Sequence, residues 1–207
     1  MRESDIPALL DMIWKMWAGK AVKAKPQVAI HYAEMVLYYE LRHSTIAFVA
    51  DDDGKAAGVC VLDIKKDHPM HTEYLMRYID AAVMMSRDPA GFDNLKHSMN
   101  AQRVFDESEE VLEGKGYGAE VTLFILDDKH RGQGIGSGMF NHIANYLNKH
   151  GVEKFYLHSD ESSFHHFYGE HRGMDQIDSR PSDGSLGEID NVTPYIYADD
   201  VKDQMHI

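Results

Sequence analysis

The feature that most constrains this chain is a glycine-rich stretch, DDKHRGQGIGSGMFNHIANYL, which begins at Asp127. Its four glycines occupy alternate positions from 132 to 138, directly before a run with helical apolar spacing. Glycine loses more conformational entropy on folding than any other residue. Glycines spaced this closely therefore indicate that something occupies the space that side chains would otherwise fill. The preceding run AEVTLFIL, Ala119 to Leu126, is typical of a buried strand. The sequence therefore predicts a strand, a glycine loop and a helix in direct succession.

A loop of this kind is suited to binding phosphate. A strand that enters a helix through glycines exposes backbone N–H groups that have no partner within the helix. Each charge-assisted hydrogen bond from such a group contributes about 1.5–3 kcal/mol, so a few aimed amides decide the affinity. Arg131 can add a fixed positive charge. We predict a pyrophosphate site here, and a glycine turn without a ligand is the alternative.

Two common phosphate-binding motifs do not fit this loop. The P-loop places Lys and then Ser or Thr after its last glycine, whereas Gly138 is followed by Met139 and Phe140. The dinucleotide fingerprint GxGxxG opens a βαβ unit, whereas GQGIGSG comes after a predicted hairpin and several predicted helices. Neither motif explains the loop.

The rest of the chain predicts one mixed α/β domain over residues 1–207. The runs TIAFVA and AAGVCVLDI, joined by DDDGK, predict a β-hairpin. Apolar spacing predicts helices at 6–17, 27–42 and 135–147, a short helix at 163–171, and a helical insert at 65–118 whose second helix lies between Asn94 and Glu113. Further strands are predicted at Glu153–Ser159, Met174–Asp178 and Thr193–Ala198.

The composition excludes several classes of partner. The formal net charge of −13 disfavours nucleic acid and anionic membranes and mildly favours cationic partners. No apolar run is long enough to cross a bilayer and MRESDIPALL lacks the profile of a secretory signal, so we expect a cytoplasmic protein. Cys60 lies in an apolar run, which favours a buried strand position over a reactive thiol. The thirteen histidines are scattered, and pairs such as His68 with His71 or His165 with His166 have no cysteine or carboxylate partners at ligand spacing, so we expect surface or core histidines and no metal site.

The run Arg131-Gly132-Gln133-Gly134-Ile135-Gly136 resembles the acyl-CoA-binding signature of the GNAT superfamily of N-acetyltransferases. It stands after a strand and before a helix, as in that family. DIPALLDMIW is similar to the family's first helix, the hairpin to its second and third strands, EKFYLHSDESSFHHFYGEHRGM to its fifth strand and following helix, and TPYIYAD to its last strand. The resemblance covers nearly the whole chain except the insert, although MRESDI leaves almost no room for the family's first strand.

This resemblance implies a GNAT-like acyl-CoA N-acyltransferase fold, with a central, strongly twisted mixed sheet flanked by helices. The fourth and fifth strands, here Ala119–Leu126 and Glu153–Ser159, would splay apart and admit the pantetheine arm of acetyl-CoA. The cofactor-binding residues that the resemblance implies are Leu126, Arg131, Gly132, Gln133, Gly134, Ile135, Gly136, Ser137, Gly138 and Ser163. Ser162 or Ser163 stands where the family commonly has Asn.

The resemblance also implies that an acceptor amine attacks the thioester directly. A lysine-like amine has a pKa near ~10.4, so a carboxylate that takes its proton is useful. Glu120 opens the fourth strand, where family members often carry a catalytic acid; a solvated strand-end glutamate is the alternative. The usual proton donor to the thiolate is a tyrosine four residues before the glycine of a Gly-Phe or Gly-Met pair. The pair here, Gly173-Met174, leaves Tyr168 one residue too far away, so Tyr168 would act only if a bulge or loop absorbs that residue; a core aromatic is the alternative.

The leading hypothesis is an acetyl-CoA-dependent N-acetyltransferase that acts on a primary amine of a small molecule or peptide, with a cationic acceptor mildly favoured. A non-catalytic acyl-CoA-binding or interaction module of the same fold is the alternative from another class. A third possibility is an enzyme of the same fold that uses a longer acyl chain. The insert would line the acceptor pocket or pack in a homodimer.

Overall fold

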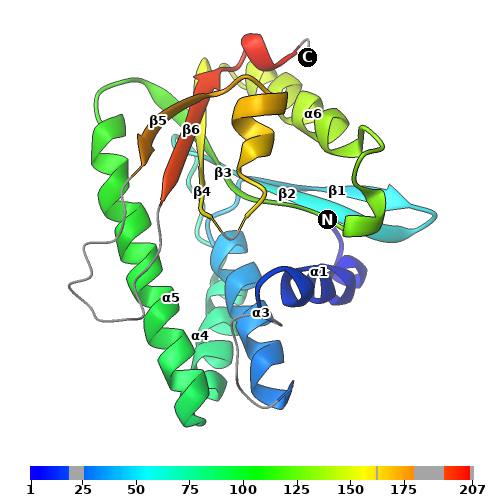
Figure 1. The fold of residues 1–207 in the computed structure, drawn as a ribbon, viewed down its shortest axis with the longest axis vertical. Helices are drawn as coiled ribbons and strands as arrows, with labels where there is room; N and C mark the ends of the chain where they lie inside the picture. The colour runs from blue at the N-terminus through cyan, green and yellow to red at the C-terminus, as the bar shows by residue number, and fades with distance from the viewer. Residues whose placement is uncertain (19–25, 162, 180–193, 206–207) are drawn as a thin grey trace. The chain divides into compact units, whose positions relative to one another are not determined.

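The structure, a computed structural model, describes residues 1–18, 26–161, 163–179 and 194–205 (Figure 1). Its strands form a six-stranded mixed sheet in the order β1-β2-β3-β4-β6-β5, in which β3 and β4 pair in parallel. The chain divides into two compact units. Unit 1 consists of residues 1–63, 67–96 and 122–135, and unit 2 consists of residues 64–66, 97–121 and 136–207. The strand β3 (Tyr117–Leu126) contributes to both units. The predicted mixed α/β class is confirmed.

Unit 1 contains the predicted hairpin and the N-terminal helices. Strands β1 (Ile46–Asp52) and β2 (Lys55–Ile64) are antiparallel, and the turn between them places Asp53 and Gly54 at positive φ, 48° and 83°. The helices are α1 (Ile6–Ile13), which continues as a π-helical turn (Trp14–Ala18), α3 (Pro26–Leu41) and α4 (Thr72–Ser86). Helix α3 packs against α1 and α4 (Figure 1). The core of this unit includes Leu9, Ile13, Leu37, Leu41, Val59, Val61 and Ile125.

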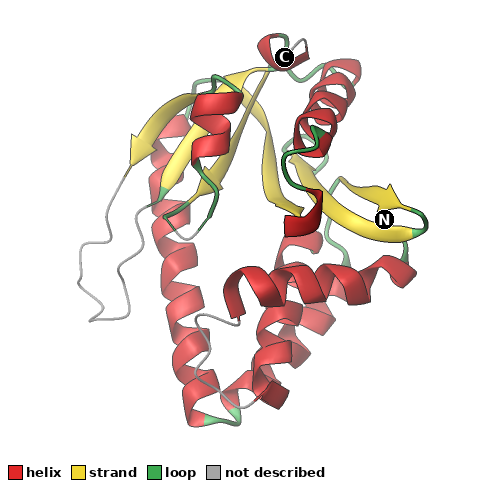
Figure 2. Cartoon of the chain, turned by 45° about the vertical axis from the view of Figure 1, so that its right-hand side comes forward, coloured by secondary structure: helices red, strands yellow, loops and turns green. Residues whose placement is uncertain are grey.

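Unit 2 contains the first half of β3 and the strands that follow it, β4 (Lys154–Ser159), β5 (Asp175–Ser179) and β6 (Tyr195–Asp200), drawn in yellow in Figure 2. The helix α6 (Ile135–Lys149) follows the glycine loop as predicted. Each of these elements was predicted within a few residues. The predicted start of β6 at Thr193 lies outside the described residues.

Strand alternation gives the sheet of unit 2 two distinct faces. In register, Glu120 pairs with Tyr156 and Tyr156 with Ala198, so these three side chains share one face. Tyr156 and Ala198 belong to a core cluster with Leu112. Leu157 and Tyr197 form the neighbouring rung and point to the other face. That second face is covered by α6, because the rings of Phe140 and Phe155 lie 5.9 Å apart.

The predicted insert is helical, but its second helix begins earlier than predicted. Helix α5 runs from Pro89 to Ser108 and a 3-10 turn follows at Glu109–Leu112. Pro89 is well suited to the first turn of a helix, and the Asp88 carboxylate accepts hydrogen bonds from the backbone N–H groups of Ala90 and Gly91 at 3.0 and 3.3 Å. The expected start at Asn94 was wrong because this cap was overlooked.

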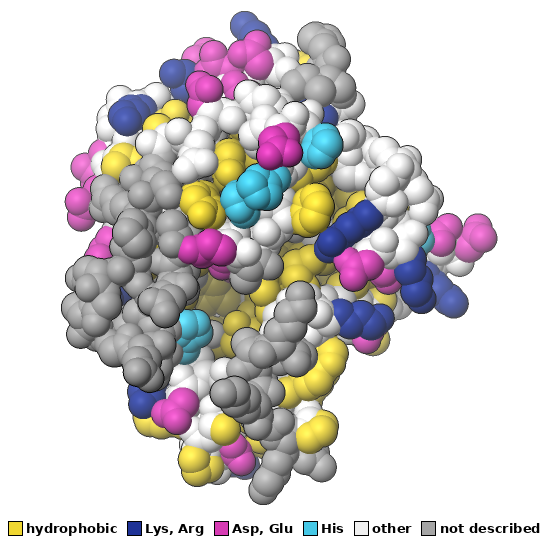
Figure 3. All heavy atoms as spheres, viewed as in Figure 1, with side chains coloured by type: hydrophobic (Ala, Val, Ile, Leu, Met, Phe, Trp, Pro, Cys, Tyr) yellow, Lys and Arg dark blue, Asp and Glu magenta, His cyan; other side chains and the backbone are white. Residues whose placement is uncertain are grey.

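At the N-terminal end, residues 1–18 form the 3-10 turn Glu3–Asp5 and helical segments, and no strand lies among them. On the face drawn in Figure 3, acidic and basic side chains are interspersed. Among the described residues, no helix is both long enough and apolar enough to cross a membrane.

Candidate active site

The glycine loop connects β3 to α6 through a short 3-10 turn. This turn, Asp128–His130, is capped by the side chain of Asp127, which accepts a hydrogen bond from the backbone N–H of Lys129 at 3.1 Å. Gly132 and Gly134 follow with φ values of 73° and 79°, a conformation that glycine adopts without strain. Helix α6 begins at Ile135, so its first backbone N–H groups lie within the predicted phosphate loop.

The loop leaves space where side chains would otherwise stand. A Cβ atom built on Gly132, Gly134 or Gly138 would meet no other atom within 4 Å. The backbone at these positions is therefore open to a close ligand, and a diphosphate fits the chemistry of an exposed helix N-terminus. Arg131 forms an ion pair with Asp128 at 2.9 Å, so its positive charge stays beside the loop.

At the end of β3, Leu126 packs against a glycine that the sequence reasoning missed. A Cβ atom on Gly58 would lie 2.7 Å from the carbonyl oxygen of Ile125 and 3.0 Å from the side chain of Leu126. The backbone of β2 can approach β3 this closely because residue 58 has no side chain. The backbone N–H of Asp127 donates to the carbonyl of Ala57 at 2.8 Å, which fixes the point where the loop leaves the sheet.

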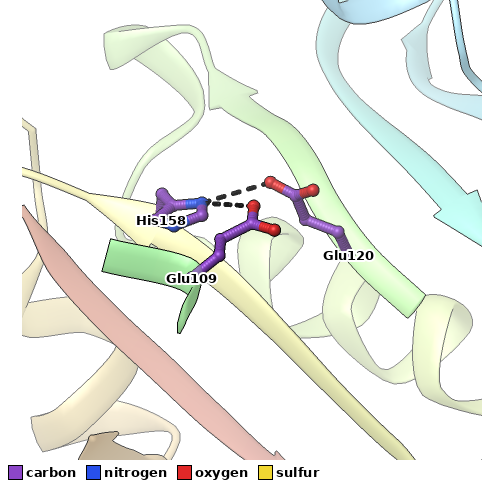
Figure 4. A group of neighbouring side chains, drawn as sticks. All are labelled: Glu109, Glu120 and His158. Carbon is purple, nitrogen blue, oxygen red and sulfur yellow. Dashed lines mark hydrogen bonds and ion pairs between the residues drawn. The ribbon is translucent and has the colours of Figure 1, made fainter. Parts of the chain in front are cut away.

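Three ionisable side chains from separate segments of unit 2 meet beside β3 (Figure 4). Glu120 comes from β3, His158 from β4 and Glu109 from the 3-10 turn after α5. The Nδ1 atom of His158 lies 3.2 Å from Oε1 of Glu120 and 3.9 Å from Oε1 of Glu109. The Tyr156 hydroxyl donates to the other oxygen of Glu120 at 3.2 Å. We call Glu109, Glu120 and His158 the acidic–histidine cluster.

The imidazole of His158 has polar neighbours at both of its ring nitrogens. Nδ1 of His158 faces carboxylate oxygens, which can only accept. Nε2 lies 3.4 Å from the hydroxyl of Ser108, and that hydroxyl already donates to the carbonyl of Phe105 at 2.7 Å. Contacts at both ring nitrogens therefore fix the orientation of the imidazole within the cluster.

The two carboxylates of the cluster have opposite pKa shifts. Burial opposes the ionisation of Glu120, but the hydrogen bond and charge of His158, together with Tyr156 and Lys65, outweigh it and hold the pKa of Glu120 below its ordinary value. Burial and the neighbouring charge of Glu120 raise the pKa of Glu109, against the opposing effect of His158. Glu120 is thus ionised near neutral pH and can accept a proton there. The ionised form of Glu109 is destabilised by burial and by the neighbouring charge of Glu120.

The same cluster has the donor set of a metal site. One ligand atom from each of its three residues lies within 4.8 Å of the others. Imidazole and carboxylate donors suit several divalent ions. In the structure these groups hydrogen-bond one another, and the prediction that the protein needs no metal stays a prediction. The expectation that the pairs His68/His71 and His165/His166 have no carboxylate partners was wrong for His68, which pairs with Asp63, and for His166, which pairs with Glu170. The contact of His158 with Glu120 joins residues 38 positions apart, which sequence spacing does not reveal.

Tyr168 lies in a π-helical turn, Phe167–His171, in which one extra residue is accommodated. The backbone N–H of Arg172 donates to the carbonyl of Phe167 at 3.1 Å, five residues earlier. The sequence places Tyr168 five residues before Gly173, one more than the spacing of four that the resemblance implies. A π-helical turn accommodates one extra residue and so can compensate for this difference. The Tyr168 ring is buried, with ring centroids 5.4 Å from Tyr197 and 6.1 Å from Phe140.

Tyr168 and Glu120 lie on opposite faces of the sheet in unit 2. Tyr168 contacts Tyr197 and Phe140, which belong to the face that α6 covers. Glu120 shares the other face with Tyr156. Glu120 and Tyr168 are therefore held on two sides of the same hydrogen-bonded ladder.

Ser163 is engaged within its own turn. Its hydroxyl donates to the carboxylate of Asp160 at 3.1 Å, and its backbone N–H donates to the carbonyl of the same residue at 3.2 Å. Its predicted contact with the cofactor stays a prediction. Ser162, the other candidate for the family's Asn position, lies outside the described residues.

The sequence matches one protein-family model, which describes the acetyltransferase (GNAT) family, over residues 7–174. This span contains the glycine loop, the acidic–histidine cluster and Tyr168. A search of curated protein sequences gives no match.

Several solved structures have a similar fold. One is the structure of SsHAT, with a TM-score of 0.57 and 18% identity, covering 97% of this chain and 96% of that one. Another is the polyamine N-acetyltransferase of Drosophila melanogaster, which catalyses the formation of N-acetylagmatine, with a TM-score of 0.56, 12% identity and 95% of each chain covered. A third is the ribosomal-protein-S18-alanine N-acetyltransferase of Escherichia coli, with a TM-score of 0.50, 15% identity, and 97% and 90% covered. At these identities the similarity concerns the fold.

Proposed function

The chain belongs to the acetyltransferase (GNAT) family, and we propose that it transfers the acetyl group of acetyl-CoA to a primary amine of a small-molecule or peptide acceptor. The observation that carries this proposal is the arrangement of Glu120 and Tyr168 on opposite faces of one sheet. In a direct transfer the C–N bond forms as the C–S bond breaks. A base on one side and an acid on the other match these two events.

The main chain between Arg131 and Gly138 holds the diphosphate of the donor. Support comes from the open backbone at Gly132, Gly134 and Gly138 and from the start of α6 at Ile135. Acetyl-CoA supplies the acetyl group as a thioester. We keep Leu126 as the residue whose backbone pairs with the pantetheine amides, because it ends β3 immediately before the loop.

Glu120 acts as the general base. The protonated acceptor first loses one proton to water, and the ionised carboxylate of Glu120 accepts the second proton as the C–N bond forms, directly or through a water molecule. His158 neutralises part of the cluster's charge, and the Tyr156 hydroxyl orients the carboxylate. Tyr168 gives a proton to the departing thiolate, for which general acid catalysis is typically worth about 10²–10⁴ in rate.

A cationic acceptor is the substrate class that the charge favours. Two carboxylates meet at the cluster and the chain has a net charge of −13, both of which attract an amine in its protonated form. Agmatine, polyamines and the N-terminal amine of a protein are the acceptors named for proteins of similar fold, and they make a suitable first panel.

The test is to incubate the protein with acetyl-CoA and this panel of amines while free thiol is measured. We expect thiol release that depends on the amine, with wild-type affinity for CoA but little release in Glu120→Gln. Tight CoA binding with no release on any amine would contradict the enzyme and favour a non-catalytic acyl-CoA-binding module. Faster release from longer acyl donors than from acetyl-CoA would contradict acetyl as the group transferred.

A further inference from the structure

Among the residues that the structure describes, Arg172 is the largest fully buried side chain, with an exposure of 0%. Its Nε atom donates to Oε1 of Gln204 at 3.0 Å, and its Nη2 atom donates to Oδ1 of Asn141 and to the backbone carbonyl of Gln204, both at 2.9 Å. The guanidinium carbon lies 4.9 Å from the centre of the Phe140 ring. One side chain thus connects α6 with the 3-10 turn Asp203–Met205.

This guanidinium has no carboxylate as a direct partner among the described residues. Its Nη1 atom is buried without a hydrogen bond. The nearest counter-charge acts through Gln204, whose Nε2 atom donates to Asp199 at 2.6 Å and to the backbone carbonyl of Arg172 at 2.9 Å. Burying a charge with incomplete pairing is costly, and an apolar side chain of similar volume is often more stable in such a place. Stability alone is therefore a poor reason for an arginine here.

The backbone of Arg172 closes the turn that carries Tyr168. Its N–H donates to the carbonyl of Phe167, which is the hydrogen bond that makes the turn π-helical. The backbone N–H of Met174 then donates to the carbonyl of Tyr168 at 3.0 Å. Because the side chain of Arg172 is fixed on Asn141 and Gln204, the position of this backbone is fixed relative to α6.

We propose that Arg172 is a positioning residue, which holds the π-helical turn in the register that aims Tyr168 at the leaving thiolate. The inference rests on the proposed function, in which Tyr168 is the general acid. Relaxation of the turn to an ordinary α-helical pattern would rotate Tyr168 by about 100° around the helix axis relative to Gly173. A change of that size would remove the hydroxyl from the thiolate without touching the diphosphate loop.

The experiment is a double-mutant cycle of Arg172→Met and Tyr168→Phe, with kcat, the affinity for CoA and the unfolding midpoint measured for each variant. We expect Arg172→Met to lower kcat by about 10- to 100-fold, as misplacement of a catalytic group does, with little change in CoA affinity. In the Tyr168→Phe background the same substitution should have almost no further effect, because residues that act as a unit are not additive. Arg172→Lys keeps the positive charge but loses the planar guanidinium group. Its kcat should lie between those of the wild type and Arg172→Met.

Val201→Ala is the matched control. Val201 is buried in unit 2 near the same C-terminal turn, so this change lowers stability, but it should not lower kcat selectively. If Arg172→Met lowers kcat by the same factor in the wild type and in Tyr168→Phe, the proposal is overturned, because the loss would be a general structural effect. If Arg172→Met does not fold, the cycle is run with Arg172→Lys.

A crystal structure of the Arg172 variant separates this inference from the proposed function. We expect the Phe167–His171 turn to lose its π-helical hydrogen bond and the Tyr168 ring to move. An unchanged turn with an unmoved ring would overturn the inference even if the wild-type protein is an active acetyltransferase. A wild-type protein that acetylates no amine would contradict the proposed function, and the place of the Tyr168 ring would still decide the role of Arg172.

Discussion

The glycine loop and the acidic–histidine cluster are built in opposite ways. The loop from Arg131 to Gly138 is one continuous segment, and what it offers a ligand is mainly backbone. The cluster offers side chains, and Glu109, Glu120 and His158 come from three segments of unit 2. The loop needs side chains to be absent, whereas the cluster needs particular side chains to be charged. One candidate site is thus formed by a contiguous segment of the sequence, and the other is formed by residues that only the fold brings together.

This difference decides how each site should respond to substitution. Almost any side chain at the open glycines of the loop should harm binding, because it would fill the space that the ligand needs. At the cluster, isosteric changes that alter only charge or hydrogen bonding should be enough to show an effect. Four substitutions, taken from the largest expected effect to the smallest, test the distinction.

Glu120→Gln should lower kcat by about 10²–10⁴, the usual range for the loss of a general base. The amide has the same shape as the carboxylate but does not accept the acceptor's proton at neutral pH. CoA affinity, measured by calorimetry, should stay at the wild-type value. A variant with wild-type turnover would show that Glu120 has a structural role only and would remove the cluster from the reaction.

Gly134→Val should weaken CoA binding by about 100-fold, which corresponds to the loss of two charge-assisted hydrogen bonds of about 1.5 kcal/mol each. A valine at φ 79° is strained and fills the space over the backbone. Gly151→Val is the matched control, because Gly151 also has a positive φ, 72°, with no atom within 4 Å of a Cβ. If both variants bind CoA like the wild type, the loop does not hold the diphosphate.

His158→Asn should shift the acid limb of the pH–rate profile upward and lower kcat at pH values near that limb, with a smaller effect at neutral pH. In the wild type, His158 holds the pKa of Glu120 below its ordinary value, so the base stays ionised as the pH falls. Without that imidazole the pKa of Glu120 rises, and the base is protonated at a higher pH. An acid limb that does not move would show that His158 has no electrostatic role in the reaction.

Glu109→Gln should have the smallest effect, a gain in unfolding free energy of less than about 0.5 kcal/mol at pH 7. The pKa of Glu109 is raised in the folded protein, so its ionised form costs stability above that pKa. The difference between variant and wild type should shrink as the pH falls through the folded-state pKa towards the ordinary value of 4.5. Chemical denaturation at several pH values measures it, and a variant that is less stable at pH 7 would mean that Glu109 stabilises the fold.

The sequence was sufficient to predict the loop and the order of strands and helices, because glycine spacing and apolar periodicity are local properties. Its choice of Glu120 as a candidate base rested on an expected place at the start of a strand, whereas β3 begins at Tyr117, and the role of Glu120 in the reaction stays a prediction. The sequence could not predict His158 and Glu109 as partners of Glu120, since His158 and Glu120 are 38 residues apart and meet only through the register of β3 and β4. The π-helical turn was equally hidden, because it depends on contacts that Arg172 makes with Asn141 and Gln204.

The two faces of the unit 2 sheet have a consequence for the enzyme between turnovers. After one proposed transfer, Glu120 holds a proton that it did not have before, and Tyr168 lacks one that it had. A ladder of hydrogen-bonded strands stands between them, so the surplus on one side cannot simply refill the deficit on the other. Each group must be reset by its own exchange with bulk water. Deprotonation of Glu120 and reprotonation of Tyr168 then form a step that is separate from acetyl transfer and has its own solvent isotope effect.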